Sequence, residues 1–213
     1  MHLNTFVERM RGYDFDQDKE HIIEDLQHLA RHRTLLSEHL CSTIKKDGFS
    51  TRNSLYGPYG YVLHHEALFS LRLGIWSPIR SADESGSIMY GVNHSHDVEI
   101  YAVGYCGDGY TTIIRDILEP GPLRAGIKPS LGEARSMKLA PGQVLHMAPF
   151  YQIHRQLPPD QLSASLSLVI HRPPTTSLEH AWCFDENYIP TCPGTATQET
   201  AFLENALSLL HRG

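Results

Sequence analysis

Two histidines in the segment Gly91-Val-Asn-His-Ser-His-Asp-Val-Glu99 have the spacing of metal ligands. His94 and His96 head a run that reads as a β-strand, and residues i and i+2 of a strand point to the same face. A third histidine, His154, follows a proline-centred turn that begins at Pro149. Three imidazoles from two strands can hold one transition-metal ion, so we predict a metal site. The alternative is structural: His94 and His96 lie at a polar strand edge and His154 closes a turn.

Two further residues compete for places in this site. Glu99 is five positions from His94 and faces the other way in a regular strand, so it would bind the ion only if a bulge turned it inward. His146 competes with His154, but the spacing from the proline favours His154 and leaves His146 as a pocket residue. Three neutral imidazoles leave open coordination positions and the full charge of the ion, which favours an anionic substrate.

The last β-like run supplies two more pocket candidates. Ser167 and His171 share a strand parity, and we expect both to face the cavity. Arg72 shares a strand face with Trp76 in an earlier run, and we interpret it as a partner in a surface ion pair rather than as a binder of acidic groups.

Composition restricts the class of protein. The chain has 213 residues, 41% of them hydrophobic and 20% charged, which is ordinary for one globular domain. The net charge is −6 and no basic stripe is visible, so we expect neither nucleic acid nor an anionic membrane as a partner. The four cysteines lack C-x-x-C spacing, and no signal-like or bilayer-spanning run is present, so we expect a cytoplasmic protein with reduced thiols.

The hydrophobic pattern changes from helical to β-like along the chain. Residues 18–47 have a helical period with a break near 31–34. From Tyr61 onward short β-like runs alternate with turns, which indicates an antiparallel sandwich or barrel. We expect three of these turns to close hairpins: Cys106–Gly109, Pro141–Gly142 and Pro158–Gln161.

We predict a single domain, residues 1–213, with three parts. They are a helical arm (1–60), an all-β barrel (61–174) and a C-terminal tail (175–213). Within the tail, residues 175–194 read as irregular, and residues 197–211 read as a short amphipathic helix.

The spacing of these motifs resembles the cupin superfamily. Its first motif is matched by Gly91, His94, His96, Glu99 and Gly104 or Gly107, and its second by Gly142, Pro149 and His154, with Tyr151 where a glycine usually stands. The resemblance covers roughly residues 61–174. It implies a double-stranded β-helix, which is a small jelly-roll barrel.

Within that superfamily the chain looks most like the cysteine dioxygenase-like branch, the thiol dioxygenases. The matching features are Leu73-Gly-Ile-Trp76, the pair His154-Arg155, and a final strand that closes on Pro173-Pro174. Tyr101 occupies the position of the cysteine that pairs with a tyrosine in that branch, and Tyr61-Val62 stands where its substrate-binding arginine is expected. Cysteine itself is therefore not the substrate that the sequence favours.

The resemblance implies an Fe(II)-dependent oxygenase that activates O2 on a small polar substrate such as a thiol, an amino acid or a derivative. The alternative is a non-oxidative cupin, either an isomerase, a lyase or a sensor, that uses Zn, Mn or Ni. A metal-free structural barrel is a third interpretation. Barrels of this type often pair through an edge strand, so the sequence also allows a homodimer.

Overall fold

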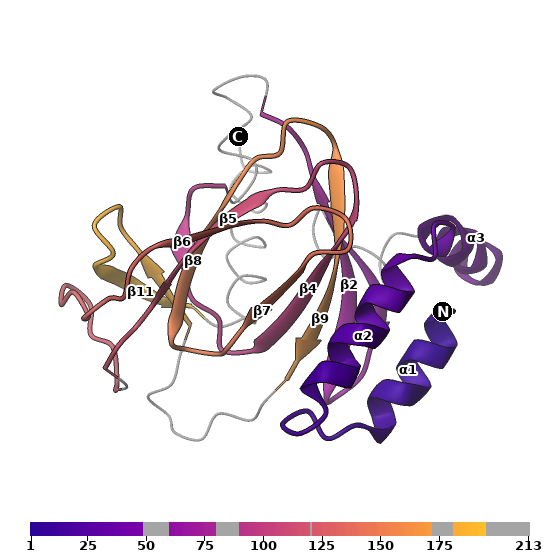
Figure 1. Ribbon diagram of the computed structural model, residues 1–213, viewed down its shortest axis with the longest axis horizontal. Helices are drawn as coiled ribbons and strands as arrows, with labels where there is room; N and C mark the ends of the chain where they lie inside the picture. The colour runs from indigo at the N-terminus through magenta and orange to yellow at the C-terminus, as the bar shows by residue number, and fades with distance from the viewer. Residues whose placement is uncertain (49–59, 80–89, 120, 172–180, 195–213) are drawn as a thin grey trace.

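The computed structural model describes residues 1–48, 60–79, 90–119, 121–171 and 181–194. Two antiparallel sheets face each other, and three helices lie to one side of them (Figure 1). Sheet A has the strand order β1-β2-β9-β4-β7, and sheet B has the order β11-β10-β3-β8-β5-β6. The strands of sheet A are β1 (Gly60–His65), β2 (Phe69–Trp76), β4 (Glu99–Cys106), β7 (Val144–Met147) and β9 (Ser163–Ile170). Those of sheet B are β3 (Asn93–His94), β5 (Thr111–Asp116), β6 (Arg135–Lys138), β8 (Gln152–Leu157), β10 (Ala181–Phe184) and β11 (Pro190–Gly194).

The strand order is that of a jelly roll. From β2 to β9 the chain changes sheet after every strand except β5, so that β2-β9-β4-β7 faces β3-β8-β5-β6. Among these strands, only β5 and β6 are neighbours both in the chain and in one sheet. The predicted cupin-like double-stranded β-helix is therefore confirmed.

The three turns predicted to close hairpins do something else. Cys106–Gly109 joins β4 to β5, Pro141–Gly142 joins β6 to β7, and Pro158–Gln161 joins β8 to β9. In each case the two strands belong to different sheets, so each turn is a corner between sheets. The hairpin prediction was wrong because a turn signal marks a change of direction but does not specify the next strand's partner.

Sheet A is buried on both faces. One set of alternating side chains packs under the helices, and the other set points into the barrel. The helix-facing set includes Leu71, Leu73, Tyr101, Val103, Leu166 and Leu168. The barrel-facing set includes Ile100, Ala102, Leu145, Met147 and Val169, together with Ile114 of sheet B. Sheet A is therefore one wall of the barrel and also the surface on which the helical arm packs.

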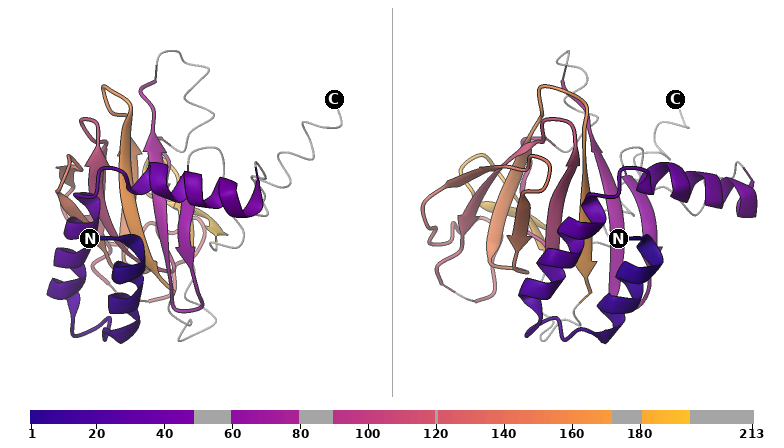
Figure 2. Two further views of the ribbon diagram at one scale, coloured as in Figure 1. Left: turned by 90° about the vertical axis from the view of Figure 1, so that its right-hand side faces the viewer. Right: turned by 45° about the vertical axis from the view of Figure 1, so that its right-hand side comes forward.

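Three helices form the N-terminal arm: α1 (Leu3–Gly12), α2 (Lys19–Ala30) and α3 (Leu35–Asp47). Helices α1 and α2 lie side by side over the outer face of sheet A, and α3 runs across near the end of α2 (Figure 2). The break between α2 and α3 was predicted, but α1 was not. None of the helices in the described ranges is long and apolar enough to span a membrane.

The C-terminal part differs from the prediction. Residues 175–194 were expected to be irregular, yet β10 and β11 lie within them and extend sheet B beyond β3. Both strands are short, and the register of their pairing shifts between Cys183 and Phe184, so they lack a long alternating pattern. The helix predicted at 197–211 lies outside the described residues.

The corner at Gly109 gives a stability prediction. Gly109 has φ of 83° and donates its N–H to Ser163 Oγ at 3.0 Å, and a Cβ there would lie 2.2 Å from Leu139 O. We expect Gly109→Ala to lower the free energy of unfolding by about 2–5 kcal/mol, because the left-handed backbone and the clash both oppose a side chain. Urea unfolding measures the change. Gly12→Ala is the control, since nothing lies within 4 Å of the position that a Cβ would take there; equal unfolding midpoints for the two variants would contradict the prediction.

Candidate metal centre

The structure brings His94, His96 and His154 together. His94 in β3 is the direct cross-strand neighbour of His154 in β8, and their ring centroids are 4.2 Å apart. His96 follows β3, and its ring centroid lies 4.9 Å from each of the other two. One ligand atom from each residue can be chosen so that all three lie within 4.8 Å of one another. The site therefore arises where two neighbouring strands of sheet B meet the link to β4.

Hydrogen bonds orient two of the rings. His94 Nδ1 lies 3.0 Å from Val92 O, so Nδ1–H donates to that carbonyl and the Nε2 lone pair is available to an ion. His154 Nδ1 lies 3.1 Å from Gln156 Nε2. Gln156 is two residues from His154 on the same strand face, and a half-turn of its amide lets Oε1 accept a hydrogen bond from Nδ1–H. Sequence reasoning missed Gln156, although strand alternation could have identified it.

The environment keeps the three imidazoles neutral. Burial lowers the pKa of His94, and it holds the pKa values of His96 and His154 well below the ordinary 6.5. The neighbouring histidines lower the pKa values of His96 and His154 further, and the charge of Arg72 adds to the effect on His96. Neutral rings are the form that binds metal.

The nitrogen distances fit a transition-metal ion. His96 Nε2 and His154 Nε2 are 2.8 Å apart. At a metal–nitrogen distance of about 2.0–2.1 Å, two ligands at right angles are about 2.9 Å apart and two tetrahedral ligands about 3.3 Å. Small side-chain movements therefore suffice to bind an ion. Three protein ligands leave coordination positions open, and three imidazoles favour a transition metal over Ca²⁺ or Mg²⁺.

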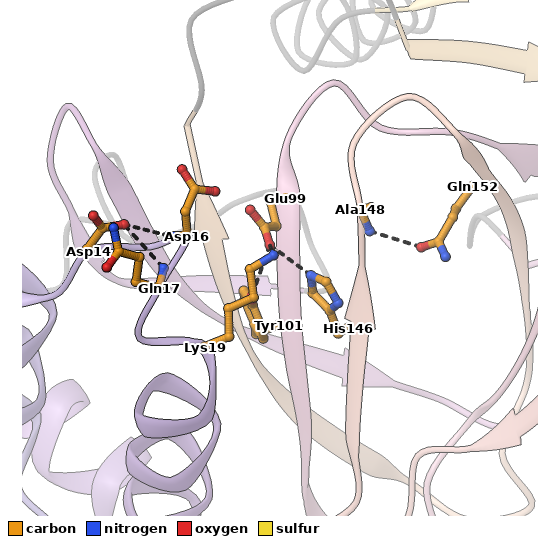
Figure 3. A network of polar contacts seen from close by, with 9 residues as sticks. All are labelled: Asp14, Asp16, Gln17, Lys19, Glu99, Tyr101, His146, Ala148 and Gln152. Atoms are coloured by element: carbon orange, nitrogen blue, oxygen red, sulfur yellow. Dashed lines mark hydrogen bonds and ion pairs between the residues drawn. The ribbon is translucent and has the colours of Figure 1, made fainter. Parts of the chain in front are cut away.

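Glu99 and His146 lie on the helix-covered face of sheet A, beside Lys19 of α2 (Figure 3). Glu99 is the first residue of β4, and its Oε1 accepts hydrogen bonds from Tyr101 Oη at 2.9 Å and His146 Nε2 at 2.8 Å. Lys19 Nζ of α2 lies 3.6 Å from the same oxygen. The side chain of Glu99 is 3% exposed, and that of Lys19 is 44% exposed. This outer-face network joins β4, β7 and α2.

Glu99 was expected to face away from His94 and to bind the ion only through a bulge, and its placement follows the strand parity. His146 was considered as a pocket residue. The structure instead uses the carboxylate of Glu99 to bind His146 and Lys19 on the helix-covered face. The expected continuous strand is also broken between His94 and Glu99, because the chain passes from sheet B to sheet A there.

The two remaining pocket candidates, Ser167 and His171, alternate along the chain with the residues of β9 that face the helices. Ser167 is paired with Arg72 of β2, and both alternate with residues that pack under the helices. His171 lies just beyond β9, and burial followed by the charge of Arg72 lowers its pKa. Arg72, which was interpreted as a partner in a surface ion pair, is partly buried, and its charge lowers the pKa values of both His96 and His171. It therefore adds positive charge beside the candidate metal site.

The Glu99 network gives a test of the ligand set. We expect Glu99→Gln to retain the metal of the three-histidine site, because Glu99 is held on the outer face by Lys19, Tyr101 and His146. The free energy of unfolding should fall by about 1–3 kcal/mol, since a buried charge-assisted network is broken. Metal analysis and urea unfolding measure the two effects. Glu24→Gln, at an exposed position of α2, is the matched control. Loss of the metal from a folded Glu99→Gln protein would contradict the prediction.

No protein-family model and no curated protein matches this chain. Among solved structures, it is similar to the DMSP lyase DddQ from Ruegeria pomeroyi DSS-3, with 14% identity, a TM-score of 0.34, and coverage of 60% of this chain and 57% of that chain. A cupin domain from Bordetella pertussis Tohama I is similar with 11% identity, a TM-score of 0.32 and coverage of 53% and 92%. A hydroquinone 1,2-dioxygenase, PnpCD, is similar with 15% identity, a TM-score of 0.31 and coverage of 53% and 63%. The chain spans little more than half of the DMSP lyase chains that it matches.

Proposed function

We propose that the protein is an Fe(II)-dependent oxygenase that acts on a small polar substrate. The observation that carries this proposal is the convergence of His94, His96 and His154 without a carboxylate in the described group. Such a set holds a redox-active ion from one side and leaves positions for two further ligands, a substrate atom and O2. When bound, Fe(II) would supply the electrons for O2 chemistry, and the protein would hold the reactants.

Charge favours an anionic group on the substrate. Three neutral imidazoles do not offset the charge of a divalent ion, and Arg72 adds a guanidinium whose field reaches His96. A thiolate or a carboxylate is the chemical group that such a site stabilises. The barrel interior holds apolar side chains, which include Ile100, Ala102 and Ile114. We therefore infer a thiol, an amino acid or a derivative as the substrate class.

A non-oxidative cupin is the second candidate. Three histidines around an open position are also a common zinc arrangement, in which the ion activates water or polarises a carbonyl group. An isomerase, a lyase or a small-ligand sensor that uses Zn, Mn or Ni would need the same three side chains. The two candidates differ in redox chemistry rather than in protein ligands.

Metal analysis and O2 uptake separate the two candidates. The protein is purified anaerobically, its metals are quantified, and an oxygen electrode follows reactions with small thiols, amino acids and their N-substituted relatives. We expect about one iron per chain and O2 consumption with at least one anionic substrate. A protein that takes up Zn, Mn or Ni in preference to Fe(II), and that consumes no O2 after reconstitution with Fe(II), would overturn the oxygenase in favour of the second candidate.

A further inference from the structure

A second group of metal-binding side chains lies in the helical arm. His2 precedes α1, His32 lies between α2 and α3, and Glu38 is in the first turn of α3. One ligand atom from each of the three lies within 4.8 Å of the other two. The rings of His2 and His32 are in edge contact, with centroids 4.8 Å apart. Three segments of the arm thus bring two imidazoles and one carboxylate to one point.

One pair in this group has the spacing of two ligands of a bound ion. His32 Nε2 lies 3.2 Å from Glu38 Oε1. Two ligands of a tetrahedral zinc ion are about 3.3 Å apart at bond lengths of about 2.0–2.1 Å, so this pair needs almost no movement. His2 is exposed, and its side chain can approach without disturbing the core.

A neighbouring hydroxyl group fixes the carboxylate. Thr34 Oγ1 donates a hydrogen bond to Glu38 Oε1 at 2.6 Å and lies 3.1 Å from His32 Nε2. A hydrogen bond from outside the ligand set is the usual support for a metal-binding carboxylate. Thr34 immediately precedes α3 and its side chain makes no capping hydrogen bond to the backbone, so its hydroxyl group serves Glu38 instead.

A cavity beside the group leaves room for the remaining ligands. Its volume is about 450 Å³, and its lining includes His2, Glu38 and His39. Water molecules in this space can complete the coordination of an ion held by three protein ligands. The mixture of nitrogen and oxygen donors suits zinc better than Ca²⁺ or Mg²⁺, which prefer oxygen ligands.

We propose that His2, His32 and Glu38 bind one zinc ion. This ion would cross-link three segments of the arm: the residues before α1, the link between α2 and α3, and α3 itself. This site is separate from the three histidines of the barrel and does not depend on the function proposed for them. Because the ion binds the folded arm and not the unfolded chain, it stabilises the arm in proportion to the logarithm of the free zinc concentration.

Zinc binding to full-length variants tests the proposal. The His96→Ala background removes a ligand of the barrel site, and equilibrium dialysis with ZnCl2 then reports on the arm. We expect His96→Ala to bind one zinc ion per chain, with a melting temperature that rises with zinc. Adding Glu38→Gln should weaken this binding at least about tenfold and abolish the shift in melting temperature.

Control variants cover the other outcomes. Glu24→Gln removes the same charge from an exposed His–Glu pair on α2, and in the His96→Ala background it should leave zinc binding unchanged. His32→Ala should reproduce the loss of zinc binding that Glu38→Gln causes. Glu38 is exposed and glutamine has nearly the same shape, so Glu38→Gln should leave the fold intact. The proposal is overturned if His96→Ala binds no zinc, if Glu38→Gln retains the native affinity, or if Glu24→Gln weakens binding equally.

Discussion

We expect the His96→Ala variant to purify without metal in the barrel site and to lose O2 uptake with every substrate that the native protein oxidises. Only His94 and His154 would remain as ligands, and we expect the loss of one imidazole of three to weaken binding by more than about 100-fold. His96 lies outside the strands, and its backbone carbonyl accepts a hydrogen bond from Phe150 N at 2.7 Å, which alanine preserves. The fold should therefore survive. Iron content, circular dichroism and O2 uptake are the measurements.

His21→Ala is the matched control for this variant. His21 lies on α2, with its side chain 64% exposed and paired with Glu24. It removes an imidazole without touching either candidate metal site, and we expect native iron content and native O2 uptake. Full iron occupancy in His96→Ala would refute the ligand assignment, and with it the basis of the proposed oxygenase.

In the metal-free protein, we expect stability to fall steeply as the pH drops below about 6.5. Burial lowers the pKa values of His94, His96 and His154 in the folded chain, whereas the unfolded chain keeps values near 6.5. The unfolded chain therefore binds more protons in this range, and the free energy of unfolding decreases with falling pH. Each histidine that stays neutral in the fold contributes about 1.4 kcal/mol per pH unit, so His96 and His154 together contribute about 3 kcal/mol per unit.

Urea unfolding of chelator-treated protein at pH 7.5, 6.5 and 5.5 measures this dependence. Asp108 does not titrate in this window, because its pKa is lowered to about 2, first by its hydrogen bond from Lys138. His96→Ala should reduce the slope below pH 6.5 by about 1.4 kcal/mol per pH unit, because one of the buried imidazoles is absent. Equal slopes for the native protein and the variant would show that His96 is protonated as readily in the fold as in the unfolded chain.

Local patterns were sufficient for the elements that are long or strongly periodic. The helical period over residues 18–47 predicted α2 and α3, and strand alternation placed Ser167 with the inward-facing residues of β9. Helix α1 was missed because its ten residues bury only Phe6, Val7 and Met10, a pattern too short to stand out. Its stability depends on packing against sheet A and α2.

The pairing of strands was less predictable. β10 and β11 are short, and the position of β10 depends on β3, nearly ninety residues earlier in the chain. The three corner turns were mistaken for hairpins because the sequence around a turn is similar whether the next strand joins the same sheet or the opposite one. Pairing over such distances depends on the whole core rather than on local residue types.

The sequence by itself determined the donor chemistry: a His-x-His pair, a later histidine after a proline-centred turn, and a run of strands able to bring them together. Only the tertiary structure decided which neighbours share that site. Glu99 is three residues from His96 but belongs to the other sheet, where it binds Lys19 and His146. Arg72 is distant in sequence, yet its charge reaches His96. Periodicity specifies which residues of a strand share a face, whereas the packing of two sheets determines what that face meets.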